Sequence, residues 1–290
     1  MTHTLLQLLR LSACLSLALA GAAACAPTHA GAPPAPMRGI YGGIPQEIVD
    51  SGRSLREFGV DAVWLGSGSS TAERVAWLRA QKLQADAEFN TMPVADYLKA
   101  HPDAAPVGTD GRVSPAPDGW QGICPTHEAY RAERMRAFRT LLETYAIDGV
   151  WLDYHHSHAS WEQAKPNMPD TCFCDRCLLR FQRDTAITLP QAPTPERAVL
   201  LLSTHRDAWV RWRLGVFTDW VREFRDIRDA TRPGALLGTF HNPWSDEDFG
   251  GARHPARPGL RSAESSATAP PGRSALGASA APKANAAQPD

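Results

Sequence analysis

The sequence has neither an excess of basic residues nor a block of acidic ones, and both absences limit its partners. Lysine and arginine number 30 against 31 aspartate and glutamate residues, so the net charge is -1. Nucleic-acid-binding proteins carry clustered positive charge, and solvating tails carry runs of like charge. We therefore expect no nucleic-acid partner, and the composition favours a neutral or weakly charged small substrate.

Two nucleotide-binding motifs are also missing. The sequence has no G-x-G-x-x-G, and its glycine-rich segment GSGSST (66–71) lacks the lysine of a phosphate-binding loop. We interpret this segment as a turn between a strand and a helix. Ser70 and Glu73 are then expected to form a capping box at the start of that helix.

The apolar run near the N-terminus, LSACLSLALAGAAA, is too short to span a bilayer. It follows Arg10 and ends in small residues before Cys25, which is typical of a secretory signal. We expect residues 1–24 to be a signal peptide and 25–36 a flexible tether. AGAAAC resembles a bacterial lipoprotein box, which predicts a lipid anchor at Cys25 and a periplasmic or outer-membrane-anchored protein. Cleavage at a nearby A-x-A site, giving a secreted protein, is the alternative.

From Met37 onward, strand and helix patterns alternate along the chain. Short apolar runs predict strands, and segments with helical spacing of apolar residues follow them. Repeated βα units specify an α/β fold with a parallel sheet, and over five units a (β/α)8 barrel of the TIM type is favoured over an open sheet. The predicted strands are 38–44, 60–68, 83–90, 147–154 and 234–241, and the predicted helices are 45–59, 70–81, 127–146, 170–187 and 195–231.

Residues 251–290 contain no aromatic residue, Val, Ile, Met or Cys. Such a composition cannot bury enough apolar surface to offset the entropy of ordering, so we expect a disordered tail. Five predicted strands precede it, whereas a closed barrel has eight, so we expect the domain at 37–250 to be truncated after about five βα units. This change in composition has two possible explanations. One is out-of-frame translation of a GC-rich gene, and the other is a genuine Pro/Ala-rich linker.

The ends of the predicted strands carry the candidate site residues, because barrel enzymes place their chemistry there. Asp153 is the sharpest candidate, since it ends the apolar run DGVWL, where burial can tune a carboxyl pKa. Capping of a loop is its alternative role. Glu247 and Asp248 are candidate acid/base residues, and an acidic helix start is their alternative. The candidate substrate-binding residues are Glu88, Asn90, Trp151, Tyr154, His155, His156, His241 and Trp244.

The segment DGVWLDY resembles the fourth-strand motif of barrel glycoside hydrolases. In the α-amylase-like and α-galactosidase-like groups, the Asp that ends this strand is the nucleophile, and the resemblance implies that role for Asp153. The wider segment 37–250 resembles bacterial glycosyl-hydrolase-like barrel proteins. The chain departs from true α-amylases, which have an Arg two positions before the Asp, where this sequence has Trp151. Specificity for α-glucans is therefore not implied.

Cysteine is scarce, yet Cys172, Cys174 and Cys177 lie within six positions. With Cys124 they make four soft ligands, enough to close a tetrahedral structural zinc site. Two disulfides are the alternative in an oxidising compartment, although C-x-C-x-x-C is tight for disulfide geometry. The arrangement is similar to that of zinc-containing bacterial β-galactosidases, barrel enzymes in which an upstream Cys and a C-x-C-x-x-C after the fourth strand bind zinc. This resemblance implies a structural zinc ion.

Three functions remain open from the sequence. The first is an exported glycoside hydrolase that acts on a carbohydrate substrate. The second is a barrel that binds carbohydrate without cleaving it, because an incomplete barrel lacks any carboxylate on its missing strands. The third is a zinc-stabilised structural or interaction domain. The sugar, the linkage, the stereochemical outcome and the oligomeric state are not indicated by any motif.

Overall fold

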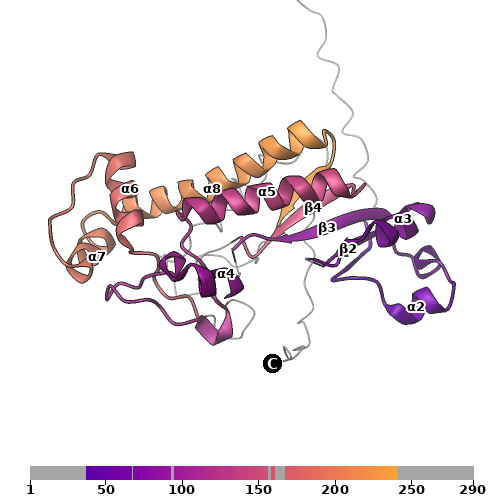
Figure 1. The fold of residues 1–290 in the computed structure, drawn as a ribbon, viewed down its shortest axis with the longest axis horizontal. Helices are drawn as coiled ribbons and strands as arrows, with labels where there is room; N and C mark the ends of the chain where they lie inside the picture. Colours follow the sequence, from indigo (N-terminus) through magenta and orange to yellow (C-terminus); the bar gives the residue numbers. More distant parts are fainter. Residues whose placement is uncertain (1–36, 67, 93–94, 156–157, 161–166, 241–290) are drawn as a thin grey trace, which may run out of the picture. The chain divides into compact units, whose positions relative to one another are not determined.

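The structure of the chain is a computed structural model, and it describes residues 37–240 except 67, 93–94, 156–157 and 161–166 (Figure 1). Some of the predictions fall outside the described residues. They concern the signal peptide and tether (1–36), the tail (251–290) and the site residues His156, His241, Trp244, Glu247 and Asp248.

Within the described residues, five parallel strands form one sheet, and each strand pairs with the next one in the chain. This sequential order is that of a (β/α)8 barrel, whereas doubly wound sheets reverse their order at a switch point. The predicted α/β fold of barrel type, with five strands in the described part, is therefore confirmed. The strands are β1 (Gly39–Tyr41), β2 (Ala62–Leu65), β3 (Gln84–Asn90), β4 (Gly149–Asp153) and β5 (Leu236–Thr239).

Helices occupy the connections between the strands, and the two longest, α5 and α8, lie side by side (Figure 1). No helix in the described part of the chain is long and apolar enough to cross a membrane. The helices are α2 (Gln46–Asp50), α3 (Ala72–Ala80), α4 (Ala95–Ala100), α5 (Glu128–Thr144), α6 (Asp175–Thr185), α7 (Thr194–Leu202) and α8 (Arg206–Thr231), with 3-10 turns η1 (Leu55–Phe58), η2 (Pro102–Ala104) and η3 (Pro117–Gly119).

Two of the predicted helices are each divided in two. The segment 45–59 forms α2 and η1, which are separated at Gly52 with a φ of 68°. The segment 195–231 forms α7 and α8, because the Ser203 hydroxyl donates to the Val199 carbonyl and the backbone of Ser203 leaves the helical region. The helical spacing of apolar residues continues across both breaks, so the sequence pattern did not reveal them.

The predicted capping box at Ser70 is wrong. Helix α3 is capped instead by Thr71, whose hydroxyl accepts a hydrogen bond from the Arg74 backbone N–H at 3.1 Å. Ser and Thr are both good N-cap residues, so adjacent candidates cannot be separated by residue type alone. Helix α6 likewise begins at Asp175, five residues after the predicted start, with Cys174 as its N-cap residue.

The sheet has an apolar outer face that packs against the helices. On β3 this face presents Ala85, Ala87 and Phe89, and the Phe89 ring lies edge to face against Phe138 of α5 and Phe224 of α8. Burial of each large apolar side chain contributes roughly 1.5–3 kcal/mol to stability. This cluster is the main core and holds α5 and α8 against the sheet. Other strand residues in it are Val63, Leu65, Val150, Leu152 and Leu237.

The opposite, inner face of the sheet carries polar and aromatic side chains. Cα partners in neighbouring strands of a parallel sheet direct their side chains to the same face, so the register identifies its members. On β3 this face holds Asp86, Glu88 and Asn90, as the alternation in LQADAEFN predicts. The neighbouring strands add Tyr41, Trp64, Trp151 and Asp153.

Two glycines make room for the tryptophan rings on the inner face. A Cβ at Gly39 would lie 2.0 Å from the Trp64 ring, and one at Gly238 would lie 2.6 Å from the Trp151 ring. The two tryptophan rings meet edge to face with their centroids 5.4 Å apart, an arrangement that aromatic pairs prefer. Trp151 is thereby fixed two residues before Asp153 on the same face.

Candidate functional site

Tyr41 and Asp153 meet at the carboxyl ends of β1 and β4. The Tyr41 hydroxyl donates a hydrogen bond to Oδ2 of Asp153 at 2.5 Å, although the residues are 112 positions apart. Burial, followed by the negative charge of Asp153 and then that of Glu88, raises the pKa of Tyr41. The phenol therefore keeps its proton and acts as a hydrogen-bond donor. Tyr41 was not among the predicted site residues.

Glu88 lies beside this pair on the inner face. Its side chain is only 9% exposed, and its carboxylate is a hydrogen-bonding neighbour of the Tyr41 phenol. A Cβ at Gly66, in the turn after β2, would lie 3.8 Å from Oε2 of Glu88. The structure therefore brings the Tyr41 phenol together with the carboxyl groups of Glu88 and Asp153. Asn90 is the Cα partner of Asp153 across the sheet and belongs to the same face.

Tyr154 fixes the second oxygen of Asp153. Its backbone N–H donates to Oδ1 of Asp153 at 2.7 Å, so both carboxylate oxygens accept a hydrogen bond. This contact is the backbone bond that the loop-capping alternative predicts, and the bond from Tyr41 is additional to it. Tyr154 has a φ of 50°, a conformation that is costly for a bulky residue and that tends to occur at functional sites.

An aromatic pair lies next to Asp153. The Tyr154 ring stacks on Trp120, with centroids 5.1 Å apart and an interplanar angle of 26°, and Trp120 is 38% exposed. Trp120 directly follows η3 in the long Pro/Gly-rich segment 93–126. Sequence reasoning missed this tryptophan because that segment has no periodic pattern. The position of Trp120 between two folded elements was the one sequence signal that could have identified it as a site residue.

His155 and His158 are held by contacts within the protein. For His155, Nδ1 lies 3.2 Å from the Thr91 hydroxyl and Nε2 lies 3.0 Å from the Phe217 carbonyl of α8. These contacts tie the end of β4 to α8, and substrate binding by His155 stays a prediction. For His158, Nδ1 accepts from a backbone N–H and Nε2 lies against a carbonyl, and burial lowers its pKa. His158 therefore anchors the segment 93–126.

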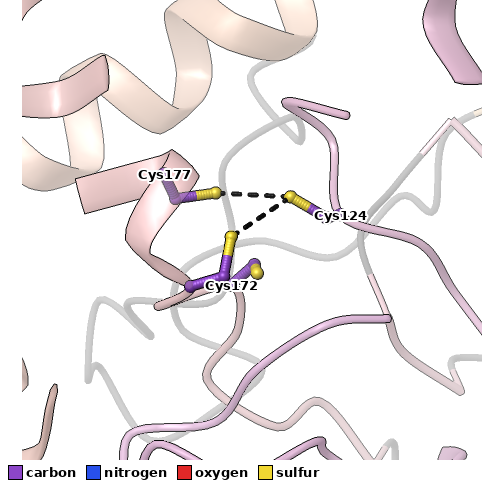
Figure 2. A group of neighbouring side chains, drawn as sticks. Cys124, Cys172 and Cys177 are labelled. Carbon is purple, nitrogen blue, oxygen red and sulfur yellow. Dashed lines mark hydrogen bonds between the residues drawn. The ribbon is translucent and has the colours of Figure 1, made fainter. Parts of the chain in front are cut away.

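The four predicted cysteine ligands come together at the start of α6. Their Sγ atoms all lie within 4.8 Å of one another, and Cys124 is 3.6 Å from Cys174 and 3.5 Å from Cys177. Figure 2 shows the thiols of Cys124, Cys172 and Cys177 directed toward one another. All four thiols are free, since these separations far exceed the roughly 2.05 Å of a disulfide bond.

The geometry of the cysteine cluster fits a tetrahedral metal site. Bonds of about 2.3 Å from a central ion to four sulfurs place those sulfurs about 3.8 Å apart. The observed separations are close to that value. Four thiolate ligands leave no open position for a substrate, so a metal ion here serves structure. The cluster can thus hold one metal ion between the segment before α5 and the start of α6.

The thiolate form is favoured at Cys124 and Cys174, whereas the hydrogen bond to Cys124 raises the pKa values of Cys172 and Cys177. Hydrogen bonds from Cys172, Cys174 and Cys177 hold the pKa of Cys124 well below its usual range. The Arg176 guanidinium donates to Asp103 and has Cys124 as a neighbour. A second, buried guanidinium, that of Arg213, donates to the Thr171 carbonyl beside Cys172 and has Cys172 and Cys177 as charged neighbours.

No protein-family model matches the chain, and no curated protein matches it. Solved structures do. The β-galactosidase from the psychrophilic Marinomonas ef1 matches 72% of this chain and 38% of its own length, with 12% identity and a TM-score of 0.50. The α-L-fucosidase isoenzyme 2 from Paenibacillus thiaminolyticus matches 75% and 34%, with 12% identity and a TM-score of 0.49. The PgaB (BpsB) glycoside hydrolase domain from Bordetella bronchiseptica matches 71% and 65%, with 13% identity and a TM-score of 0.47.

The likeness to the Marinomonas β-galactosidase supports the fold alone, because the sequences share so few residues. The chain spans about a third to two thirds of the lengths of these three structures. The fold of the described residues is similar to that of the Marinomonas β-galactosidase.

Proposed function

We propose that the protein is an exported, carbohydrate-active protein of the glycoside-hydrolase type, which binds a sugar at the carboxyl ends of its strands. The observation that carries this proposal is the hydrogen bond from Tyr41 to Asp153, which unites two strand ends that are distant in sequence. Barrel enzymes assemble their sites from such strand ends. The match to a β-galactosidase of the same fold supports the proposal.

Asp153 is the reacting carboxylate in this proposal. Glycoside hydrolysis passes through an oxocarbenium-like transition state, which a preorganised carboxylate stabilises. Tyr41 and the Tyr154 N–H hold one oxygen each, so the carboxylate of Asp153 needs no reorientation when positive charge develops. Asp153 acts as nucleophile or charge stabiliser.

Trp120 and Tyr154 provide an apolar surface for the sugar ring. Tyr154 directly follows Asp153 in the chain, Trp120 stacks on the Tyr154 ring, and Trp120 is partly exposed. Ligand pockets combine aromatic walls with a few polar groups that fix orientation. A sugar that lies on this pair would present its ring to the Asp153 carboxylate.

Zinc is the metal that we propose for the cysteine cluster. Zinc favours four-coordinate tetrahedral sites made of thiolates, and such sites contribute directly to folding free energy. Here the ion would tie the segment before α5 to the start of α6, on either side of β4. It would stabilise the loops around Asp153 without touching a reacting atom.

The test is hydrolysis of a panel of 4-nitrophenyl glycosides, combined with carbohydrate-array binding, by the wild type. We expect turnover of at least one glycoside and binding of the corresponding sugar. Binding without turnover would instead indicate a non-catalytic carbohydrate-binding barrel, and absence of both would contradict a carbohydrate-directed function.

A further inference from the structure

The hydroxyl of Thr126 lies between two sulfurs of the cysteine cluster. Its Oγ1 is 3.2 Å from Sγ of Cys124 and 3.1 Å from Sγ of Cys177, both within hydrogen-bonding distance for sulfur. Thr126 is only 2% exposed, and both cysteines are buried. Buried polar groups are normally hydrogen-bonded, and the cluster itself supplies the partners of this hydroxyl.

The backbone around Thr126 is fixed on both sides of the residue. The indole N–H of Trp220 on α8 donates to the Pro125 carbonyl at 3.0 Å. The His127 N–H donates to the Cys124 carbonyl at 3.1 Å and closes a turn, and His127 is the N-cap residue of α5. These contacts hold the Thr126 hydroxyl in position beside the two sulfurs.

A backbone N–H reaches a third sulfur of the cluster. The Val107 N–H donates to Sγ of Cys172 at 3.3 Å, and the Val107 carbonyl accepts from the Phe173 N–H at 2.8 Å. The two bonds hold the chain at Val107 alongside the C-x-C-x-x-C segment. Polar contacts to the buried sulfurs thus come from two separate parts of the chain, at Val107 and at Thr126.

We propose that Thr126 is a positioning residue of the metal site, whose hydroxyl donates to the thiolate of Cys124 or Cys177. Together with the Val107 N–H, it sets the affinity of the cluster for its metal ion. This inference rests on the zinc site proposed above, and it adds the residues outside the four ligands that decide how tightly the ion is held.

The charge of the cluster explains why donors are needed around it. Four thiolates carry twice the negative charge that a divalent ion offsets. Such an excess is costly in a buried site unless hydrogen-bond donors face it. A hydroxyl has one proton, so Thr126 donates to one of its two sulfurs at a time. Donors of this kind orient the ligands, and their loss typically lowers metal affinity about 10–100-fold.

The test compares Thr126→Val, which replaces the hydroxyl by a methyl group of similar size, with Thr126→Ser, which keeps the hydroxyl. Competition with a chromogenic chelator measures the affinity for zinc. Thr126→Val should bind zinc about 10–100-fold more weakly than the wild type, and Thr126→Ser should stay within a few fold of it. Thr144→Val changes an exposed threonine at the end of α5 and should match the wild type.

Cobalt substitution gives a readout that a change in packing alone would not move. A thiolate that loses a hydrogen bond gives up electron density more readily to the metal ion. The sulfur-to-cobalt charge-transfer band of Thr126→Val should therefore lie at longer wavelength than that of the wild type. Thr126→Ser should keep the wild-type band.

Unchanged zinc affinity in Thr126→Val would overturn the role of Thr126. Weaker binding without a shift of the cobalt band would assign the loss to packing and would overturn it as well. If Thr126→Val does not fold, Thr126→Ala removes the same hydroxyl without a methyl group in its place and should show the same two changes.

A wild-type protein that binds no zinc would overturn the zinc site and this inference with it. The glycoside panel and the carbohydrate array do not measure metal binding, so a failure of the carbohydrate-directed function is distinguishable from a failure of the metal site.

Discussion

The Sγ atoms of Cys124 and Cys177 lie 3.5 Å apart, although the residues are separated by 53 positions that include the whole of α5 and β4. This contact brings the chain before α5 to the first turn of α6. A metal ion shared by these thiols would close that connection as a covalent cross-link closes a loop.

Metal analysis of the purified protein should find one zinc ion per chain. Cys172→Ser should abolish this stoichiometry and lower the melting temperature, because a structural site contributes its binding energy to folding. Cys25→Ser, which leaves the four-cysteine set intact, should keep the zinc. Absence of metal together with the mass of two disulfides would contradict the proposed site.

Asp86 should make stability depend on pH. Burial raises its pKa to about 7, against the Gln84 hydrogen bond and with help from Asp148, whereas an unfolded Asp titrates near pH 3.9. Between these values the folded state holds a proton that the unfolded state has lost, so the free energy of unfolding falls as pH rises through this window. The stabilisation is complete below about pH 4 and is lost above about pH 7.

Asp86→Asn keeps the shape and removes the titration. The free energy of unfolding of the wild type should fall by about 2–3 kcal/mol from pH 5 to pH 8, and Asp86→Asn should not show this fall. Urea unfolding at the two pH values measures the difference. Asp50→Asn changes an exposed carboxylate on α2 and serves as control. An equal effect of Asp86→Asn at both pH values would exclude a raised pKa.

Trp120→Ala should weaken sugar binding by roughly tenfold, because aromatic stacking contributes about 0.5–1.5 kcal/mol beyond the buried area. Trp120→Phe should retain most of the affinity. Isothermal titration calorimetry with the sugar identified on the array gives both values. Leu179→Ala removes another exposed apolar side chain and should have no effect. An unchanged affinity of Trp120→Ala would remove this tryptophan from the binding site.

Export and lipid attachment predict a mature protein that begins at Cys25. Mass spectrometry of the protein from its native membranes should show loss of residues 1–24 and a mass increase from acyl chains. Cys25→Ala should release the protein from the detergent phase in a Triton X-114 partition. Wild-type protein found in the aqueous phase, with a mature terminus at a neighbouring alanine, would indicate ordinary secretion instead.

The sequence predicted those features that depend on local periodicity. The two faces of β3 follow from the strict alternation of polar and apolar residues along the strand. The cysteine cluster was predictable because cysteine is scarce in this chain, and four cysteines are enough to form one tetrahedral metal site. In each of these cases the chain itself carries the pattern.

The residues that were missed depend on tertiary register. Tyr41 follows an unremarkable glycine-containing run, and only the ordering of β1 to β4 brings its phenol to Asp153. Trp120 lies in an aperiodic segment whose path is fixed by distant contacts, such as the one from Gly122 to His158. No single-sequence pattern encodes such contacts, because they depend on how separate elements pack.

The most direct measurement is the kinetics of Asp153→Asn, a near-isosteric change that removes the negative charge held by Tyr41 and Tyr154. With the best aryl glycoside, kcat should fall at least about 100-fold while the sugar still binds within a few fold of the wild-type affinity. Asp226→Asn, which alters an exposed aspartate on α8, should keep wild-type kinetics. Turnover by Asp153→Asn within a few fold of the wild type would contradict the proposed role of Asp153 as the reacting carboxylate.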